Sequence, residues 1–105
     1  MKINSRETAS FSKISKDTNL IHLNKKIAHN FFIKEPIVHG IYLSLIVLSK
    51  FIEKKNSNIL ITNISLNFKN FLNINEKFSI KFYKKKIIVH NDFHNKLEIC
   101  LKYKK

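Results

Sequence analysis

The sequence has one cysteine, one proline, one glycine, one arginine and no tryptophan. The single Cys100 cannot form a disulfide within the chain, and the histidines lack zinc-finger spacing, which excludes a disulfide-stapled secreted domain and a structural zinc site. The longest apolar run, Ile41 to Leu48, is far shorter than the roughly 20 residues that cross a bilayer. Residues 1–15 lack the apolar stretch of a signal peptide. The sequence therefore predicts a soluble, cytoplasmic protein that does not enter a membrane.

What the sequence does have is positive charge and many apolar side chains. Its 105 residues include 20 Lys and Arg but only 7 Asp and Glu, for a formal net charge of +13 at pH 7. Such a charge attracts polyanions. Proteins that read nucleic acids favour arginine and exposed aromatic rings, however, and here Arg6 is the only arginine while most phenylalanines fall on alternating positions typical of a core. Nucleic-acid binding is therefore disfavoured. With 44% apolar residues the chain should fold, and its length predicts a single domain over residues 1–105.

Apolar spacing divides the chain into a helical first half and a strand-rich second half. It predicts a helix over Glu7 to Lys16, an irregular segment from Asp17 to Glu35 with one helical turn near Lys25 to His29, and a helix over Ile41 to Phe51. This last helix is apolar almost all round and should be buried at the centre of the fold. Alternating apolar residues predict strands at 64–68, 78–82, 87–90 and 97–103, joined by turns at 70–77 and 91–96. Short connections favour antiparallel neighbours, so we expect an α+β fold in which an antiparallel sheet wraps one long buried central helix.

Two side chains that can exchange protons lie five residues apart in the irregular segment. Asp17, one of only two aspartates, precedes His22 within FSKISKDTNLIHLN, residues 11–24. An ionised carboxylate can take a proton from water, and an imidazole that titrates near pH 6.5 can return one. On a loop the two groups can converge on one water molecule. The spacing alone is equally typical of a surface aspartate and a capping histidine.

A second segment, EPIVHGIYL at residues 35–43, holds the only proline and the only glycine. Gly40 falls at the start of the apolar helix, where backbone N–H groups are unpaired, and its missing side chain would let a substrate oxygen approach. The helix dipole favours a developing negative charge at this end. A glycine that merely lets the chain turn into the helix would look the same.

Taken together, residues 11–43 resemble the MaoC-like hotdog family, which includes (R)-specific enoyl-CoA hydratases and related acyl dehydratases. The family signature has, in this order, an aromatic residue, a small residue, Gly or another residue, Asp, any residue, Asn, Pro, an aliphatic residue and His. Further along the chain it has Pro, two aliphatic residues, His and Gly. This chain has Ser15-Lys16-Asp17-Thr18-Asn19-Leu20-Ile21-His22 and then Pro36-Ile37-Val38-His39-Gly40. Lys16 and Leu20 depart from the usual Gly and Pro. Ser65 to Lys69 resembles the first strand after the family's central helix.

The resemblance implies a reversible addition of water to a trans-2-enoyl thioester, which gives an (R)-3-hydroxyacyl thioester. Asp17 would be the base on the water, His22 the acid that protonates the α carbon, and the Gly40 N–H the donor to the thioester carbonyl oxygen. Asn19 would order the catalytic loop, and His39 would pack at the start of the helix. The resemblance implies neither a metal nor a separate cofactor, because coenzyme A or phosphopantetheine is part of the substrate.

The resemblance also implies partners and alternatives. We expect a homodimer whose two sheets join, and an acyl-CoA or an acidic acyl carrier protein that meets the positive surface. No strand is evident before the first helix, so the fold should be a small or N-terminally shortened version. Thioesterases and the carrier-protein dehydratases of fatty-acid synthesis are disfavoured, because they place an acidic residue in the central helix and Gly40 to Ile52 has none. The alternative function is a catalytically degenerate hotdog module that binds acyl thioesters or polyanions such as nucleic acid.

Overall fold

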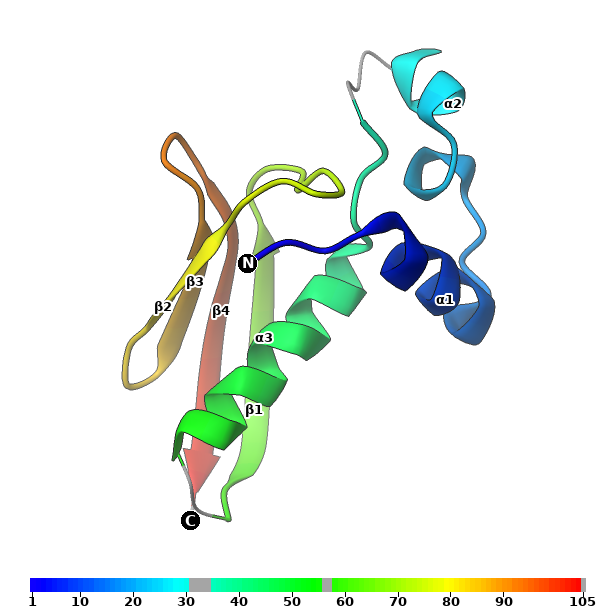
Figure 1. Cartoon of the computed structure of the whole chain (residues 1–105). Coiled ribbons are helices and arrows are strands. Elements are labelled where there is room, and N and C mark those ends of the chain that lie inside the picture. Colours follow the sequence, from blue (N-terminus) through cyan, green and yellow to red (C-terminus); the bar gives the residue numbers. More distant parts are fainter. Residues whose placement is uncertain (31–34, 56–57, 105) are drawn as a thin grey trace.

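The structure is a computed structural model that describes residues 1–30, 35–55 and 58–104. Its elements follow in the order α1 (Ser5–Ser15), η1 (Leu20–His22), α2 (Lys25–Asn30), α3 (Gly40–Lys55), β1 (Leu60–Phe68), β2 (Ser79–Phe82), β3 (Lys86–His90) and β4 (Asn95–Lys104) (Figure 1). Each predicted helix and strand has a counterpart, with ends shifted by a few residues. Residues 31–34 of the predicted irregular segment lie outside the described residues. Within the described ranges, no helix is both long enough and apolar enough to span a membrane.

The strands pair in the order β1-β4-β3-β2, and every pair is antiparallel. The prediction that β1 and β2 would be neighbours is wrong, because these two strands lie at opposite edges of the sheet. Residues 69–78, which join them, do not fold back as a turn. Instead, the Val38 N–H donates to the Leu72 carbonyl oxygen (2.7 Å) and the Ile74 N–H donates to the Pro36 carbonyl oxygen (2.9 Å). The connection is therefore held against the segment that leads into α3.

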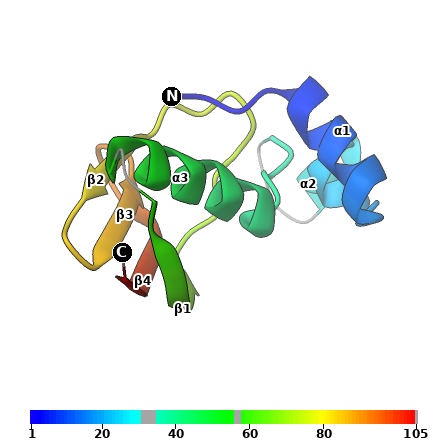
Figure 2. The same ribbon diagram turned by 90° about the horizontal axis from the view of Figure 1, so that it is seen from below.

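The core lies between α3 and one face of the sheet, as Figure 2 shows. On α3, Leu43, Val47 and Phe51 recur every four residues, so they share one face of the helix, and all three are buried. They pack with the alternating buried residues of β3 and β4, which are Ile87, Val89, Leu97, Ile99 and Leu101. Burial of each large apolar side chain contributes about 1.5–3 kcal/mol relative to exposure. This is the predicted α+β arrangement.

The central helix α3 is buried on the face that meets the sheet, but its opposite face, which is also apolar, remains open to solvent. Ile41, Leu45 and Ile52 are 44 to 55% exposed. The sheet covers only the opposite side of the helix, and α1 and α2 lie beyond its N-terminal end rather than over its outer face (Figure 2). The helix therefore presents an apolar surface that the described chain does not cover.

A capping box starts α1. Asn4 Oδ1 accepts a hydrogen bond from the Glu7 N–H (2.9 Å), and Glu7 Oε1 accepts one from the Asn4 N–H (3.4 Å). Ahead of α1 the described residues contain no strand, as predicted. Residues 1–3 instead run beside residues 75–78, where the Phe78 N–H donates to the Met1 carbonyl oxygen and the Asn75 N–H donates to that of Ile3.

Candidate active site

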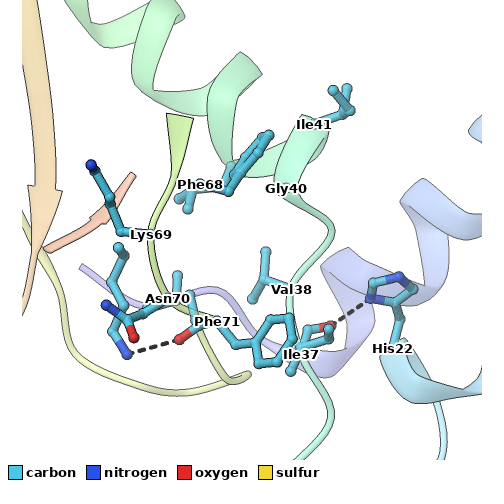
Figure 3. Close-up of a pocket in the computed structure, with 12 residues that line it drawn as sticks. His22, Ile37, Val38, Gly40, Ile41, Phe68, Lys69, Asn70 and Phe71 are labelled. Carbon is cyan, nitrogen blue, oxygen red and sulfur yellow. Dashed lines mark hydrogen bonds between the residues drawn. The ribbon is translucent and has the colours of Figure 1, made fainter. Parts of the chain in front are cut away.

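His22 is held at the end of a short helical turn that Asn19 caps. Asn19 Oδ1 accepts a hydrogen bond from the Ile21 N–H (3.1 Å) at the start of η1. The turn ends at His22, whose Nδ1 lies 2.8 Å from the Ile37 carbonyl oxygen (Figure 3). Because a carbonyl oxygen only accepts, Nδ1 carries the proton in this bond. The other nitrogen, Nε2, is then available for a proton or for a water molecule.

Asp17 faces this nitrogen. Its Oδ2 lies 3.8 Å from His22 Nε2, which is too long for a direct hydrogen bond but close enough for one water molecule to contact both atoms. The Asp17 side chain is 52% exposed and that of His22 is 10% exposed, so the pair lies where solvent meets the interior. The structure thus brings the two predicted residues together in an arrangement that can hold a water molecule and move its protons.

His39 is a third member of this cluster, and sequence reasoning gave it only a packing role. Its ring stacks on that of His22, with centroids 3.8 Å apart and an angle of 19° between the ring planes. Its Nε2 lies 3.3 Å from the Asp17 carbonyl oxygen and 4.0 Å from Asp17 Oδ2. The only signal in the sequence was its place in the second motif, directly before Gly40.

Asp17, His22 and His39 offer potential metal-ligand atoms that lie within 4.8 Å of one another. Two stacked, nearly parallel imidazoles cannot both direct an in-plane lone pair at one ion, and metal ligation by histidine uses that lone pair. His39 Nε2 is also already within hydrogen-bond distance of two oxygen atoms. The geometry therefore suits proton transfer better than metal binding.

Gly40 begins α3 beside this cluster. The Leu43 N–H donates to the His39 carbonyl oxygen (3.1 Å), so the Gly40 amide precedes the first N–H that the helix pairs. A Cβ atom on Gly40 would lie 2.6 Å from Cε1 and 2.9 Å from Cζ of Phe68. Only glycine permits this close approach of the ring. Phe68 was expected in the core but is half exposed, and its ring lies over the start of α3 (Figure 3).

A cavity of about 610 Å³ opens beside Gly40 and His22. One wall is the segment that leads into α3, and the other is the end of β1 with the residues that follow it (Figure 3). The lining residues are His22, Ile37, Val38, Gly40, Ile41, Leu43, Phe68, Lys69, Asn70, Phe71, Leu72 and Lys96. Most of these side chains are apolar, and the volume is typical of a small-molecule site. An apolar chain can therefore lie in the cavity with a polar head group near Gly40 and His22.

A buried lysine, Lys96, holds the cavity wall that follows β1. Lys96 Nζ donates to the Phe71 carbonyl oxygen (2.8 Å) and forms an ion pair with Glu76 Oε2 (3.1 Å). Asn91 Nδ2 donates to the same carboxylate oxygen (2.7 Å). The charge of Lys96 is thus compensated, and the connection after β1 is tied to β4. The local sequence contains no signal for this contact, because Phe71 and Glu76 precede Lys96 by 20 residues or more in the chain.

His39 should make the stability of the protein depend on pH. The pKa of His39 is lowered from its ordinary 6.5, mainly because burial disfavours the charged ring. The hydrogen bond to the Asp17 carbonyl oxygen acts in the opposite direction. Of the nearby charges, His22 lowers the pKa and Asp17 raises it. Below about pH 6.5 the unfolded chain then binds more protons at this position than the folded chain does. The free energy of unfolding should therefore fall as the pH drops below about 6.5, and this loss should be complete below the pKa of His39 in the folded state.

Urea unfolding at about pH 7.5 and pH 5.5 measures this effect. The wild type should lose more stability between the two values than the His39→Gln variant does, because glutamine does not titrate. Equal losses in the two proteins would show that His39 does not contribute.

An antiparallel sheet packed on one long helix, with an Asp–His pair and an apolar cavity at the start of that helix, defines a hotdog-type α+β domain. Two solved structures share this fold. The (R)-hydratase from A. caviae involved in PHA biosynthesis matches with a TM-score of 0.76 and 18% identity over 99% of this chain and 89% of that chain. The ChsH1-ChsH2 complex from Mycobacterium tuberculosis matches with a TM-score of 0.74 and 11% identity over 98% of this chain and 88% of that chain.

The chain belongs to the MaoC-like domain family, whose sequence model matches residues 1–97. This match confirms the family that the two motifs predicted, and the solved structures confirm the hotdog fold. The protein is thereby a member of a family of hydratases and dehydratases. A comparison with curated proteins gives no significant match.

Proposed function

We propose that the protein catalyses the reversible hydration of trans-2-enoyl thioesters to (R)-3-hydroxyacyl thioesters. The observation that carries this proposal is the Asp17–His22 pair, in which His22 also lines the apolar cavity beside Gly40. The family supports a hydratase or dehydratase reaction, and the motif positions support these roles for the residues. An enoyl thioester has the matching chemistry, with an apolar chain, a carbon that water can attack and a carbonyl oxygen that takes up negative charge.

In the proposed reaction, one water molecule lies between Asp17 Oδ2 and His22 Nε2. Asp17 takes a proton from this water as the water oxygen bonds to C3 of the enoyl group. The electrons of the C2–C3 double bond move towards the thioester, and the Gly40 N–H together with the helix dipole stabilises the negative charge on the carbonyl oxygen. His22 Nε2 then gives its proton to C2, and the carbonyl reforms. The proton on Asp17 returns to His22, whose Nε2 is 3.8 Å away, and this resets the pair.

The proposal needs no metal and no separate cofactor, because coenzyme A or the phosphopantetheine of a carrier protein is part of the substrate. Either carrier is anionic, and the net charge of +13 would favour its approach.

The test of the proposed reaction is the loss of enoyl absorbance with crotonyl-CoA, a longer enoyl-CoA and an enoyl-carrier protein. If all three bind and none is hydrated, the degenerate binding module is the correct alternative. Nucleic-acid affinity that persists at raised salt would instead favour the polyanion function.

We also propose that two copies pair through β1 and the open face of α3. β1 is a nine-residue edge strand, with one side unpaired in the described chain. Its exposed apolar residues are Leu60, Ile64 and Phe68, and those of α3 are Ile41, Leu45 and Ile52. An unpaired apolar edge favours association, and antiparallel pairing of one strand with its own copy is compatible with two-fold symmetry. A second copy is therefore the occupant that this surface fits.

Light scattering at micromolar concentration should give the mass of two chains for the wild type. Ile64→Lys places a charge in the middle of the proposed interface and should shift the protein to the monomer. Phe93→Lys is the matched control, because Phe93 is 85% exposed in the turn between β3 and β4, away from β1, and this variant should remain dimeric. A monomeric wild type, or a dimeric Ile64→Lys variant, would contradict the proposed interface.

A further inference from the structure

His39 is enclosed by the two residues of the proposed proton-transfer pair and by α1. Its side chain is only 2% exposed. One face of the ring stacks on His22, and Phe11 of α1 meets the ring edge to face at 5.0 Å. The ring is therefore fixed in position, and it contacts His22 and Asp17 from the interior of the protein.

Its hydrogen bonds determine which nitrogen of His39 carries the proton. Nε2 lies 3.3 Å from the Asp17 carbonyl oxygen and 3.1 Å from Ser12 Oγ. Because the carbonyl oxygen only accepts, the proton is on Nε2. Nδ1 then has the lone pair, and it is buried without a hydrogen-bond partner among the described residues. His39 is thus built as a neutral donor to the Asp17 backbone, and burial favours this neutral form by lowering its pKa.

Both residues of the pair gain a second constraint from this ring. Asp17 is half exposed and follows the end of α1, so its position depends on how the loop is held. The His39 Nε2–H ties the Asp17 carbonyl to the buried interior. The plane of the His22 ring is set by its bond to Ile37 on one side and by the stacked His39 ring on its face.

We propose that His39 is a positioning residue for the Asp17–His22 pair, with its Nε2–H holding the Asp17 loop and its ring holding the plane of the His22 imidazole. The effect of His39 on catalysis rests on the proposed function, whereas its effect on the positions of Asp17 and His22 is independent of that function. With the rings only 3.8 Å apart, two positive charges would repel each other, so a neutral His39 leaves the catalytic proton to His22.

Two variants separate the two contacts. His39→Phe keeps a ring against His22 but removes the donor to Asp17, whereas His39→Gln keeps an N–H donor but removes the ring. In NMR spectra of the protein without substrate, the Asp17 carbonyl ¹³C signal should shift in the Phe variant and stay near its wild-type position in the Gln variant. The His22 Nδ1–H signal should be retained in the Phe variant and exchange faster in the Gln variant. If one variant fails to fold, the other still tests its own contact.

Activity supplies the second test. A misplacement of about 1 Å can cost about 100-fold in rate, so we expect His39→Phe to lower kcat by about 10- to 100-fold and to change KM by less than about threefold. In an Asp17→Asn background the same change should lower residual activity by less than about threefold, because a positioning residue acts through the group that it positions. Equal losses in both backgrounds, or unchanged NMR signals in both variants, would overturn the proposal. If the wild type is inactive but the NMR shifts occur, the proposed function fails and the contacts of His39 stand.

Discussion

Replacing Asp17 by asparagine should lower kcat for the hydration of crotonyl-CoA by about 10²- to 10⁴-fold, the usual contribution of a general base. Asparagine has nearly the same shape as aspartate but cannot take a proton from water. KM should change little, because Asp17 contacts the water rather than the acyl chain in the proposed complex. The rate of loss of enoyl absorbance at saturating substrate measures the effect.

The fold provides the control for this prediction. Asp17 is half exposed, and asparagine keeps the Oδ1 atom that accepts the Asn19 N–H (3.4 Å), so thermal unfolding of the variant should stay close to that of the wild type. His22→Gln should cause a loss of similar size. The double variant should be little worse than either single variant, because the two residues act on one water molecule as a unit. An Asp17→Asn variant that keeps more than about a tenth of the wild-type kcat would contradict the role of Asp17 as the base.

Replacing Gly40 by alanine should lower kcat/KM by about 100-fold with little change in stability. The new methyl group would meet the Phe68 ring at 2.6 Å, so the ring must move. Phe68 is half exposed and can swing outward, so the cost in stability should be small. The activity should nevertheless be lost, because the methyl group and the displaced ring both lie at the cavity beside the Gly40 amide.

Phe68→Ala separates the two causes of this loss. The Gly40→Ala/Phe68→Ala double variant removes the displaced ring but keeps the methyl group beside the amide. We expect it to remain inactive, because the thioester oxygen must approach the Gly40 N–H closely. Thermal unfolding of each variant serves as the control for stability. A Gly40→Ala enzyme within about threefold of the wild type would show that the amide does not contact the substrate.

The sequence predicted the secondary structure and two parts of the site because these depend on local patterns. Alternating apolar residues define the strands, and the motifs around Asp17 and Gly40 are contiguous in the chain. The strand order could not be predicted this way. It depends on hydrogen bonds between residues 36–38 and 72–74, and a short connection between β1 and β2 gives no sign of them. The positions of His39 and Phe68 were missed for the same reason, since their contacts come from distant segments.

The structure shows how Lys16, one departure from the family signature, is accommodated. Lys16, which stands where the family usually has glycine, ends α1 with φ of 62° and ψ of 15°. This left-handed conformation costs a residue with a side chain about 1–2 kcal/mol, whereas glycine adopts it freely. The chain therefore keeps the backbone conformation that the family glycine permits, and the turn that leads into Asp17 is retained.

The most direct test of the proposed reaction is mass spectrometry of crotonyl-CoA after incubation with the wild-type protein in H₂¹⁸O. The account predicts a thioester heavier by one molecule of labelled water, with ¹⁸O on C3 in the (R) configuration, and no such product from the Asp17→Asn protein. If the wild type returns crotonyl-CoA unchanged, or if the Asp17→Asn protein forms the labelled product as quickly, then the Asp17–His22 pair does not add water to an enoyl thioester.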